Sequence, residues 1–233
     1  MIAYIPARGG SKRIPRKNIR PLDGRPILAH VIEVLLATAS IDTVFVSTDD
    51  DEIAQVAVST GASWLGHREA ELANDKAGFS DLIRGDLQRH TAAANDDEVL
   101  FVLPTAALLR SQILEQAIIE WRVKRPDILM SVISYSKSPY WALIPKDDGF
   151  LQPLFPEMVR INSQDLPPAY TDAGLFYVFS VENMALYDNH KDVPRLQPFA
   201  VPSDIAIDID TEDDWATLET LYATRELRAQ GLD

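Results

Sequence analysis

The amino-acid sequence predicts an α/β fold built on a mostly parallel sheet, and three observations support this prediction. Short runs of β-branched and aliphatic residues alternate with longer segments of helical periodicity, which is the pattern of βαβ units. A basic loop containing glycines follows the first apolar run directly, as ligand-binding loops do at the carboxyl edge of such sheets. With 233 residues, of which 46% are hydrophobic, the chain can form one large domain with a sizeable core.

Four strands and four helices are expected in the first part of the chain. The expected strands are at residues 1–5, 43–47, 98–103 and 128–135, and the expected helices are at 26–39, 51–60, 78–93 and 111–123. In the first helix, Ile27, Val34 and Leu35 fall on one face. Ser111 is the expected N-cap of the fourth helix. Right-handed crossovers between these strands would make this part of the sheet parallel.

The pattern changes between residues 136 and 172, where prolines interrupt the apolar runs. Short antiparallel strands are the most that this segment is expected to form. The alternation then resumes, with strands expected at 174–180 and 201–210 and a closing helix at 213–228. We therefore expect a single domain over residues 1–233, with the insertion at 136–172 packing on another subunit.

Composition excludes several classes of protein. The chain has no cysteine, which removes disulfides, thiolate metal sites and a cysteine nucleophile. No apolar run reaches the ~18 residues of a membrane-spanning helix, and the first residues are apolar before they are charged, unlike an export signal. The formal net charge of −13 argues against binding to nucleic acid or to an anionic membrane surface. A cytoplasmic protein that acts on small molecules is expected.

Positive charge is nevertheless concentrated in one loop. Seven of the 22 lysine and arginine residues lie in a single short stretch: Arg8, Lys12, Arg13, Arg16, Lys17, Arg20 and Arg25. In an acidic protein this concentration indicates a site for a small polyanion, although a solvated charge run would have the same composition. Gly9 and Gly10 would let backbone N–H groups approach a phosphate closely. Arg8, Lys12 and Lys17 would neutralise a triphosphate and the charge that grows on a leaving pyrophosphate.

Residues 6–18 resemble the signature of the acylneuraminate cytidylyltransferase family, whose members make CMP-activated nonulosonic acids. The loop has neither the spacing of a Walker A loop nor that of a dinucleotide-binding turn. Its second half is most similar to the pseudaminic acid branch of that family. Other segments match in the same order along nearly the whole chain: 46–50, 68–75, 103–106, 163–174 and 207–211.

This resemblance implies a Rossmann-like nucleotidyltransferase domain that uses CTP, Mg²⁺ or another divalent cation, and a nonulosonic acid, and that forms a homodimer. The implied reaction is attack by the anomeric 2-hydroxyl of the sugar acid on the α-phosphorus of CTP, with release of pyrophosphate. Arg8, Lys12 and Lys17 are the implied catalytic residues. Nucleotide contacts are expected from Ala7, Arg8, Gly9, Gly10, Ser11, Lys12, Lys17, Asn18, Arg68 and Gly78. Sugar contacts are expected from Thr105, Gln164, Asp165, Tyr170 and Asp172.

Two acidic residues near the C-terminus suggest a metal site from the residues themselves. Isoleucines alternate with small or acidic residues over 205–210, which would place Asp208 and Asp210 on one face of the expected strand. Two carboxylates beside a triphosphate suit Mg²⁺, which takes phosphate oxygens and water as its other ligands. The family's metal-binding segment is similar. The alternative is a purely structural role, because Thr211 and Asp214 have the spacing of a capping box for the final helix.

Several features leave alternatives open. Thr48 and Asp50 precede a helix and would cap it whatever the function. Leu103 stands where sialic-acid members carry glutamine, which points away from N-acetylneuraminate. Asn162 stands where an arginine often precedes the Ser-Gln-Asp motif in the family. The sugar could be pseudaminic, legionaminic, N-acetylneuraminic or a Kdo-type acid, and no side chain stands out as a general base. A sugar-1-phosphate enzyme using UTP or GTP, or a non-catalytic nucleotide-binding module, are the competing classes.

Overall fold

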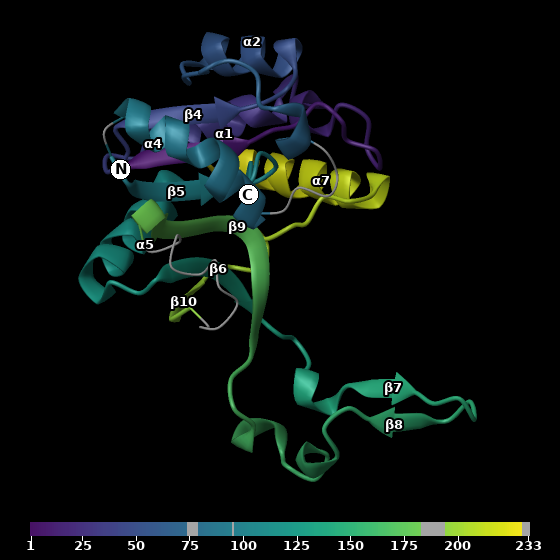
Figure 1. Cartoon of the computed structure of the whole chain (residues 1–233). Helices are drawn as coiled ribbons and strands as arrows, with labels where there is room; N and C mark the ends of the chain where they lie inside the picture. Colours follow the sequence, from purple (N-terminus) through teal and green to yellow (C-terminus); the bar gives the residue numbers. More distant parts are fainter. Residues whose placement is uncertain (74–78, 95, 183–193, 230–233) are drawn as a thin grey trace.

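A six-stranded sheet forms the centre of the protein, as seen in a computed structural model that describes residues 1–73, 79–94, 96–182 and 194–229 (Figure 1). The strands, in sheet order, are β10 (Leu196–Ala200), β6 (Ile128–Ser134), β9 (Tyr170–Ser180), β5 (Glu98–Val102), β1 (Ile2–Pro6) and β4 (Thr43–Ser47). Strand β9 runs antiparallel to both of its neighbours, whereas the β1–β4, β1–β5 and β6–β10 pairs are parallel. The predicted α/β class with a mostly parallel sheet is confirmed.

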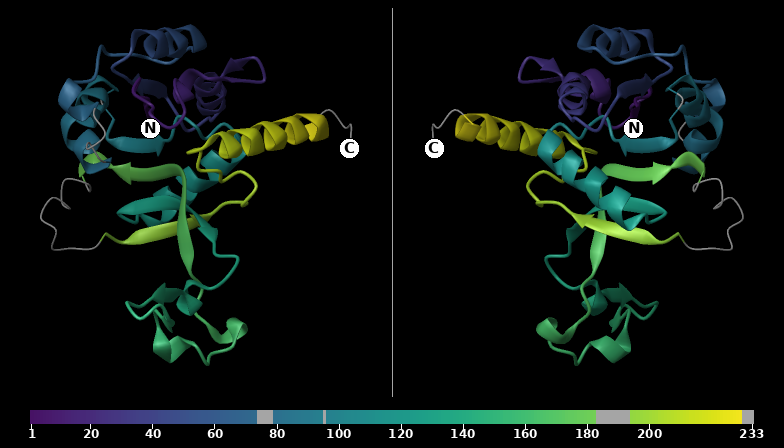
Figure 2. Two further views of the ribbon diagram at one scale, coloured as in Figure 1. Left: turned by 90° about the vertical axis from the view of Figure 1, so that its right-hand side faces the viewer. Right: turned by 90° about the vertical axis from the view of Figure 1, so that its left-hand side faces the viewer.

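Helices cover both faces of this sheet. They are α1 (Ile27–Leu36), α2 (Asp51–Thr60), α3 (Phe79–Leu82), α4 (Gln88–Ala94), α5 (Ser111–Lys124) and α7 (Glu212–Ala229). A π-helical turn, Ile83–Leu87, joins α3 to α4, so the helix expected here is continuous but irregular. Ala3 and Ile5 of β1 pack in the core with α1, α5 and α7, whereas Ile2 and Tyr4 point to the α3–α4 side. Figure 2 shows α7 as the long helix beside the sheet. Within the described ranges, no helix has both the length and the apolar character needed to cross a membrane.

Shorter elements complete the domain. They are the hairpin of β2 (Pro21–Leu22) and β3 (Arg25–Pro26) and 3-10 turns at Lys17–Ile19, Ala70–Leu72, Pro139–Trp141, Pro156–Met158 and Ser163–Asp165. The hairpin turns at Asp23 and Gly24, whose φ angles of 50° and 74° are those that an Asp-Gly turn of type I′ requires. Helix α5 begins at Ser111 itself, and Arg110 occupies the cap position without a side-chain hydrogen bond. The prediction that Ser111 caps this helix is therefore wrong.

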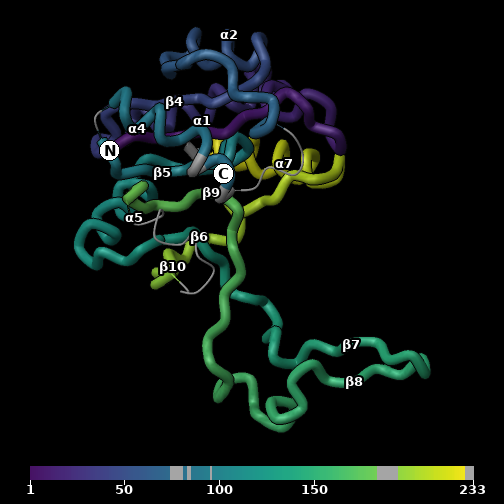
Figure 3. The backbone as a smooth tube through the Cα atoms, in the orientation of Figure 1, coloured from purple at the N-terminus to yellow at the C-terminus, as the bar shows by residue number. Residues whose placement is uncertain are grey.

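The insertion projects away from the sheet as an arm (Figure 1, Figure 3). Its hairpin pairs β7 (Leu143–Pro145) with β8 (Leu151–Pro153) in antiparallel register, as expected for this segment. The arm returns to the sheet at Tyr170, four residues before the strand expected at 174–180. Residues 170–172 pair with the end of β6 across a register shift, which extends β9 toward the arm.

The prediction of a strand at residues 201–210 is wrong, because these residues form no strand. Asp208 and Asp210 therefore do not share a strand face. The edge strand is instead β10, which precedes this segment. Val201, Ile205 and Ile209 are its buried hydrophobic residues, four positions apart, so burial does not follow the period of two that a strand requires.

Candidate active site

A cleft of about 560 Å³ opens where the basic loop leaves β1. Eight of the predicted site residues line it: Arg8, Ser11, Lys12, Lys17, Asn18, Arg68, Thr105 and Asp208. Leu103, which was matched to the family's sugar-side segment, also lines it, and Phe101 and Tyr177 add aromatic surface that was not expected from the sequence. A cleft that combines several cations with aromatic walls suits a small ligand that carries both phosphates and rings.

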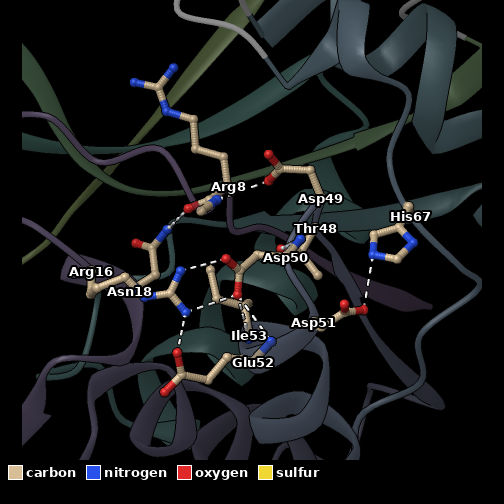
Figure 4. A network of polar contacts seen from close by, with 11 residues as sticks. Arg8, Arg16, Asn18, Thr48, Asp49, Asp50, Asp51, Glu52, Ile53 and His67 are labelled. Carbon is tan, nitrogen blue, oxygen red and sulfur yellow. Dashed lines mark hydrogen bonds and ion pairs between the residues drawn. The ribbon is translucent and has the colours of Figure 1, made fainter.

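The basic loop is held in place by the residues that follow β4 (Figure 4). The amide of Gly9 donates to Oδ1 of Asp49 at 2.9 Å, and Nδ2 of Asn18 donates to the carbonyl oxygen of Arg8 at 2.9 Å. A Cβ atom on Gly9 would lie 2.7 Å from Oδ2 of Asp50, so only glycine allows this approach without a shift. The side chain of Arg8 extends away from this network in Figure 4. The expected phosphate contacts of Gly9 and Gly10 stay predictions.

Asp50 links the basic loop to helix α2. Its carboxylate accepts the amides of Glu52 and Ile53, both at 3.0 Å, so it is the N-cap of α2. Thr48 Oγ1 in turn accepts the amide of Asp50 at 3.1 Å. Arg16, in the left-handed region with φ 56°, donates from both terminal nitrogens to Asp50, and this hydrogen bonding lowers the pKa of that carboxyl. The capping role considered for Asp50 is therefore confirmed, whereas Thr48 contacts the cap residue and not an amide of the helix.

On its other side, the loop contacts the segment before α7. Lys17 Nζ donates to the backbone oxygen of Ile209, and Arg13 Nη1 lies 2.5 Å from Oδ2 of Asp210. Lys17 also lies 4.0 Å from Asp210. Burial lowers the pKa of Lys17, against the opposing effect of the carboxylates of Asp210 and Asp208. Residues nearly 200 positions apart in sequence thus meet at one end of the cleft.

The two aspartates of this segment have different surroundings. Asp208 lines the cleft, whereas Asp210 is paired with Arg13. In the part of the chain that the structure describes, no group of three or more His, Cys, Asp or Glu side chains could hold a metal ion alone. Two carboxylates fit Mg²⁺ when phosphate oxygens and water complete its shell. The capping box is also present, since Asp214 accepts the amide of Thr211 at 2.7 Å and its own amide donates to Thr211 Oγ1 at 3.2 Å.

Arg68 forms part of the buried floor of the cleft. Its side chain donates from Nε to Oγ of Ser47 at 2.9 Å, and a terminal nitrogen donates to the backbone oxygen of Ser47. The amide of Ala7 donates to the same backbone oxygen at 2.9 Å, so two of the residues expected near the nucleotide meet at the end of β4. Gly78, a third residue expected there, lies outside the described residues.

Comparison with known proteins identifies the family. Residues 2–138 match the family described as Cytidylyltransferase. The chain belongs to the cytidylyltransferase family. It is 32% identical over 222 residues to a pseudaminic acid cytidylyltransferase of Campylobacter jejuni, covering 95% of each chain. It is also 32% identical over 230 residues to a CMP-N,N'-diacetyllegionaminic acid synthase of Legionella pneumophila, again covering 95% of each chain.

A solved structure of a CMP:2-keto-3-deoxy-manno-octonic acid synthetase in complex with CTP shares the fold. Its TM-score is 0.71, at 17% sequence identity, and the comparison covers 96% of this chain and 98% of the other. At that identity the likeness concerns the fold alone. It agrees with the predicted Rossmann-like nucleotidyltransferase architecture.

The remaining wall of the cleft in this cytidylyltransferase comes from β9 and the end of β5. Thr105 and Tyr177 line it, and the hydroxyl of Tyr177 donates to the carboxylate of Asp172. Burial, followed by this carboxylate, raises the pKa of Tyr177, so its hydroxyl keeps its proton at neutral pH. No local motif marks Tyr177, because its position depends on the insertion of β9 between β5 and β6.

Three of the residues expected to contact the sugar lie outside the cleft of their own chain. Gln164, Asp165 and Tyr170 are exposed on or at the base of the arm, and Asn162 Nδ2 donates to Asp165 at 3.3 Å. None of the three is among the residues that line the cleft. Six of the ten residues expected to contact the nucleotide thus line one cleft, whereas these three sugar residues lie apart from it.

Proposed function

We propose that this chain is a CTP-dependent cytidylyltransferase that forms a CMP-nonulosonic acid and pyrophosphate, with pseudaminic acid as the acceptor. The observation that carries the proposal is the basic loop, which lines one cleft together with Arg68, Thr105 and Asp208. The similarity to the Campylobacter jejuni enzyme, at 32% identity over 95% of both chains, supports the choice of sugar. The similarity to the Legionella pneumophila enzyme makes a legionaminic acid the second candidate.

The basic loop is proposed to bind the triphosphate. Arg8, Lys12 and Lys17 would neutralise it and stabilise the charge that develops on the leaving pyrophosphate. The hydrogen bonds from Gly9 to Asp49 and from Asn18 to Arg8 hold the loop in one conformation. Because groups of the protein itself make these contacts, less reorganisation is needed when charge develops.

The proposed chemistry is one displacement at phosphorus. The anomeric 2-hydroxyl of the sugar acid attacks the α-phosphorus of CTP and loses its proton to water, while the bond to the bridging oxygen breaks and pyrophosphate leaves with the electron pair. Mg²⁺ bound through Asp208 and Asp210 would supply Lewis acidity that makes the attacking hydroxyl more acidic. Lys17, tied to Ile209, keeps the phosphate-binding loop beside these two carboxylates.

We also propose that the protein is a cytoplasmic homodimer formed through the insertion at 136–172. The arm exposes several large apolar side chains to solvent: Trp141, Leu143, Phe150, Leu151, Leu154, Val159 and Tyr170. Such a concentration on one projecting segment favours burial against a second surface. Dimerisation would also bring Gln164, Asp165 and Tyr170 toward a cleft in the second copy, where the resemblance expects them to contact the sugar.

Pyrophosphate release tests the proposal directly. The assay contains Mg²⁺ and compares CTP with UTP and GTP, and pseudaminic acid with legionaminic and N-acetylneuraminic acids. Release from CTP alone, and fastest with pseudaminic acid, is the expected result. Faster release with legionaminic acid would move the assignment to that sugar, and no release with any sugar would contradict the proposed reaction.

Lys17 gives the sharpest variant for this assay. Lys17→Gln should lower kcat/KM by about 10²- to 10³-fold, because it removes a cation proposed to contact the triphosphate. Lys124→Gln is the matched control, since Lys124 lies at the exposed end of α5 and pairs with Glu120 in its own helix. Equal activities for the two variants would remove Lys17 from the mechanism.

A further inference from the structure

Beneath the cleft lies a buried carboxylate that the proposed mechanism does not use. Asp86 is only 2% exposed and belongs to the π-helical turn between α3 and α4. It accepts the hydroxyl of Tyr4 at 2.6 Å and the hydroxyl of Ser47, and pairs with Arg89 at 2.9 Å. π-Helical turns are rare overall and are found frequently at functional sites.

A hydrogen-bonded chain leads from Asp86 to the cleft. Ser47, fully buried, donates its hydroxyl proton to Asp86 and accepts Nε–H of Arg68 at 2.9 Å. The backbone oxygen of Ser47 accepts a second N–H of Arg68. Two contacts to one residue fix the orientation of the guanidinium of Arg68, a residue that is 5% exposed and lines the cleft.

Arg68 is linked to Asp86 through Ser47, and this link leaves part of its guanidinium for a ligand. In the described part of the chain, no ion pair joins Arg68 directly to Asp86, and the other N–H groups of Arg68 have no acceptor. A direct carboxylate partner would occupy the fork of N–H groups that guanidinium uses for bidentate binding. Linking through Ser47 orients the side chain and leaves those donors for a ligand.

The protons of this network have a single consistent arrangement. Burial and the nearby Asp86 raise the pKa of Tyr4, so its hydroxyl remains a donor. Burial lowers the pKa of His90, whose Nδ1 lies 2.9 Å from the backbone oxygen of Asp86, so the ring is neutral and donates from Nδ1. Asp86 therefore accepts from every neighbour, and the hydroxyl of Ser47 has to point toward it and away from Arg68.

We infer that Asp86 is a positioning residue for nucleotide binding, which it controls by orienting Ser47 and, through Ser47, Arg68. The inference rests on the proposed CTP site, in which Arg68 lies on the nucleotide side. It predicts that Ser47→Ala and Asp86→Asn weaken CTP binding although neither residue lines the cleft. Loss of a hydrogen bond to a charged group corresponds to about tenfold weaker binding.

Isothermal titration of CTP into the protein tests whether Asp86 and Ser47 act through Arg68. The single variants are Ser47→Ala, Asp86→Asn and Arg68→Gln. Two double variants combine Arg68→Gln with Ser47→Ala and with Asp86→Asn. We expect about a tenfold rise in Kd for each single network variant. In the Arg68→Gln background, the same substitutions should change the Kd by less than about twofold, because residues that act through one another are not additive. Equal losses in both backgrounds would show a merely structural effect and would overturn the inference.

Ser131→Ala is the matched control for folding. Ser131 is a second fully buried serine in the same sheet, and its hydroxyl contacts the amide and carbonyl oxygen of Phe176, both at 3.0 Å. It should lose stability like Ser47→Ala but keep the wild-type Kd for CTP. If wild-type protein binds CTP and Ser47→Ala and Asp86→Asn bind it equally well, the inference fails. If wild-type protein does not bind CTP, the proposed function fails instead.

Discussion

At the residue scale, Gly9 marks the closest approach of the basic loop to the N-cap of α2. A Cβ atom there would lie 2.7 Å from Oδ2 and 2.9 Å from Cβ of Asp50, whereas a Cβ on Gly10 meets nothing within 4 Å. We expect Gly9→Ala to lower the free energy of unfolding by about 1–3 kcal/mol, as overpacking does. Gly10→Ala should stay within about 0.5 kcal/mol of wild type. Urea denaturation without ligand measures both, and equal stabilities would show that the loop moves away from Asp50 without cost.

Asp210 is the proposed metal ligand whose carboxylate already has a cationic partner. Its carboxylate is paired with Arg13, so we expect Mn²⁺ to bind weakly unless CTP phosphates attract that cation away. With CTP present, Asp210→Asn should weaken Mn²⁺ binding, measured by electron paramagnetic resonance, by at least about tenfold. Asp213→Asn is the control, because it removes the same charge from the first turn of α7 without touching the loop. Unchanged Mn²⁺ binding in Asp210→Asn would refute the metal assignment.

The residues of the basic loop were predictable because they are contiguous and follow a strand directly. Arg8, Lys12 and Lys17 line the cleft as expected, since a loop at the carboxyl end of a parallel strand lies at the edge of the sheet where ligands bind. Tyr177 was not predictable in the same way. It reaches the cleft only because β9 pairs with both β5 and β6, and such long-range pairing leaves no local mark in the sequence.

At the scale of the element, α5 lacks a side-chain cap. Arg110 occupies the cap position with φ −127° and ψ 145°, the extended conformation in which a short acceptor would bind the first amides of the helix. Arg110→Asn should therefore raise the free energy of unfolding by about 1 kcal/mol. Arg110→Gln is the control, because it removes the same charge without supplying a short acceptor. If the two variants are equally stable in urea, charge and not capping explains the change.

The segment before α7 shows where reasoning from periodicity fails. Alternation of isoleucine with small or acidic residues predicted a strand at 201–210, but only every fourth residue is a buried hydrophobic one. The true edge strand, β10, contains Pro198, which sequence rules allow at an edge and disfavour in a central strand. The apolar pattern of β10 is weak because this strand lies at the edge of the sheet, next to β6, and is more exposed than a central strand. The capping box of Thr211 and Asp214, a purely local pattern, was predicted correctly.

At the scale of the whole molecule, the order of helices and strands was largely predictable and the order of strands within the sheet was not. Successive elements follow from local hydrophobic periods, which each segment carries in its own sequence. The position of β9 between β5 and β6 depends on contacts between segments far apart in the chain. The same limit applies to the arm, whose prolines predicted an irregular insertion but whose exposed apolar side chains became visible only in three dimensions.

Apolar side chains at the tip of the arm are the proposed contact between two copies of the chain. Phe150 and Leu151 are 73% and 63% exposed at the end of the β7–β8 hairpin, and a stable dimer needs about 1,200–2,000 Å² of buried surface. Wild-type protein should be a dimer by light scattering, and the double variant Phe150→Glu/Leu151→Glu a monomer. Val123→Glu is the control, because Val123 is 78% exposed on α5, outside the arm, and should leave the dimer intact. The monomer should bind CTP normally but release pyrophosphate slowly, since Gln164, Asp165 and Tyr170 would have no second cleft to reach. A wild-type monomer, or a double variant that stays dimeric, would contradict assembly through the arm.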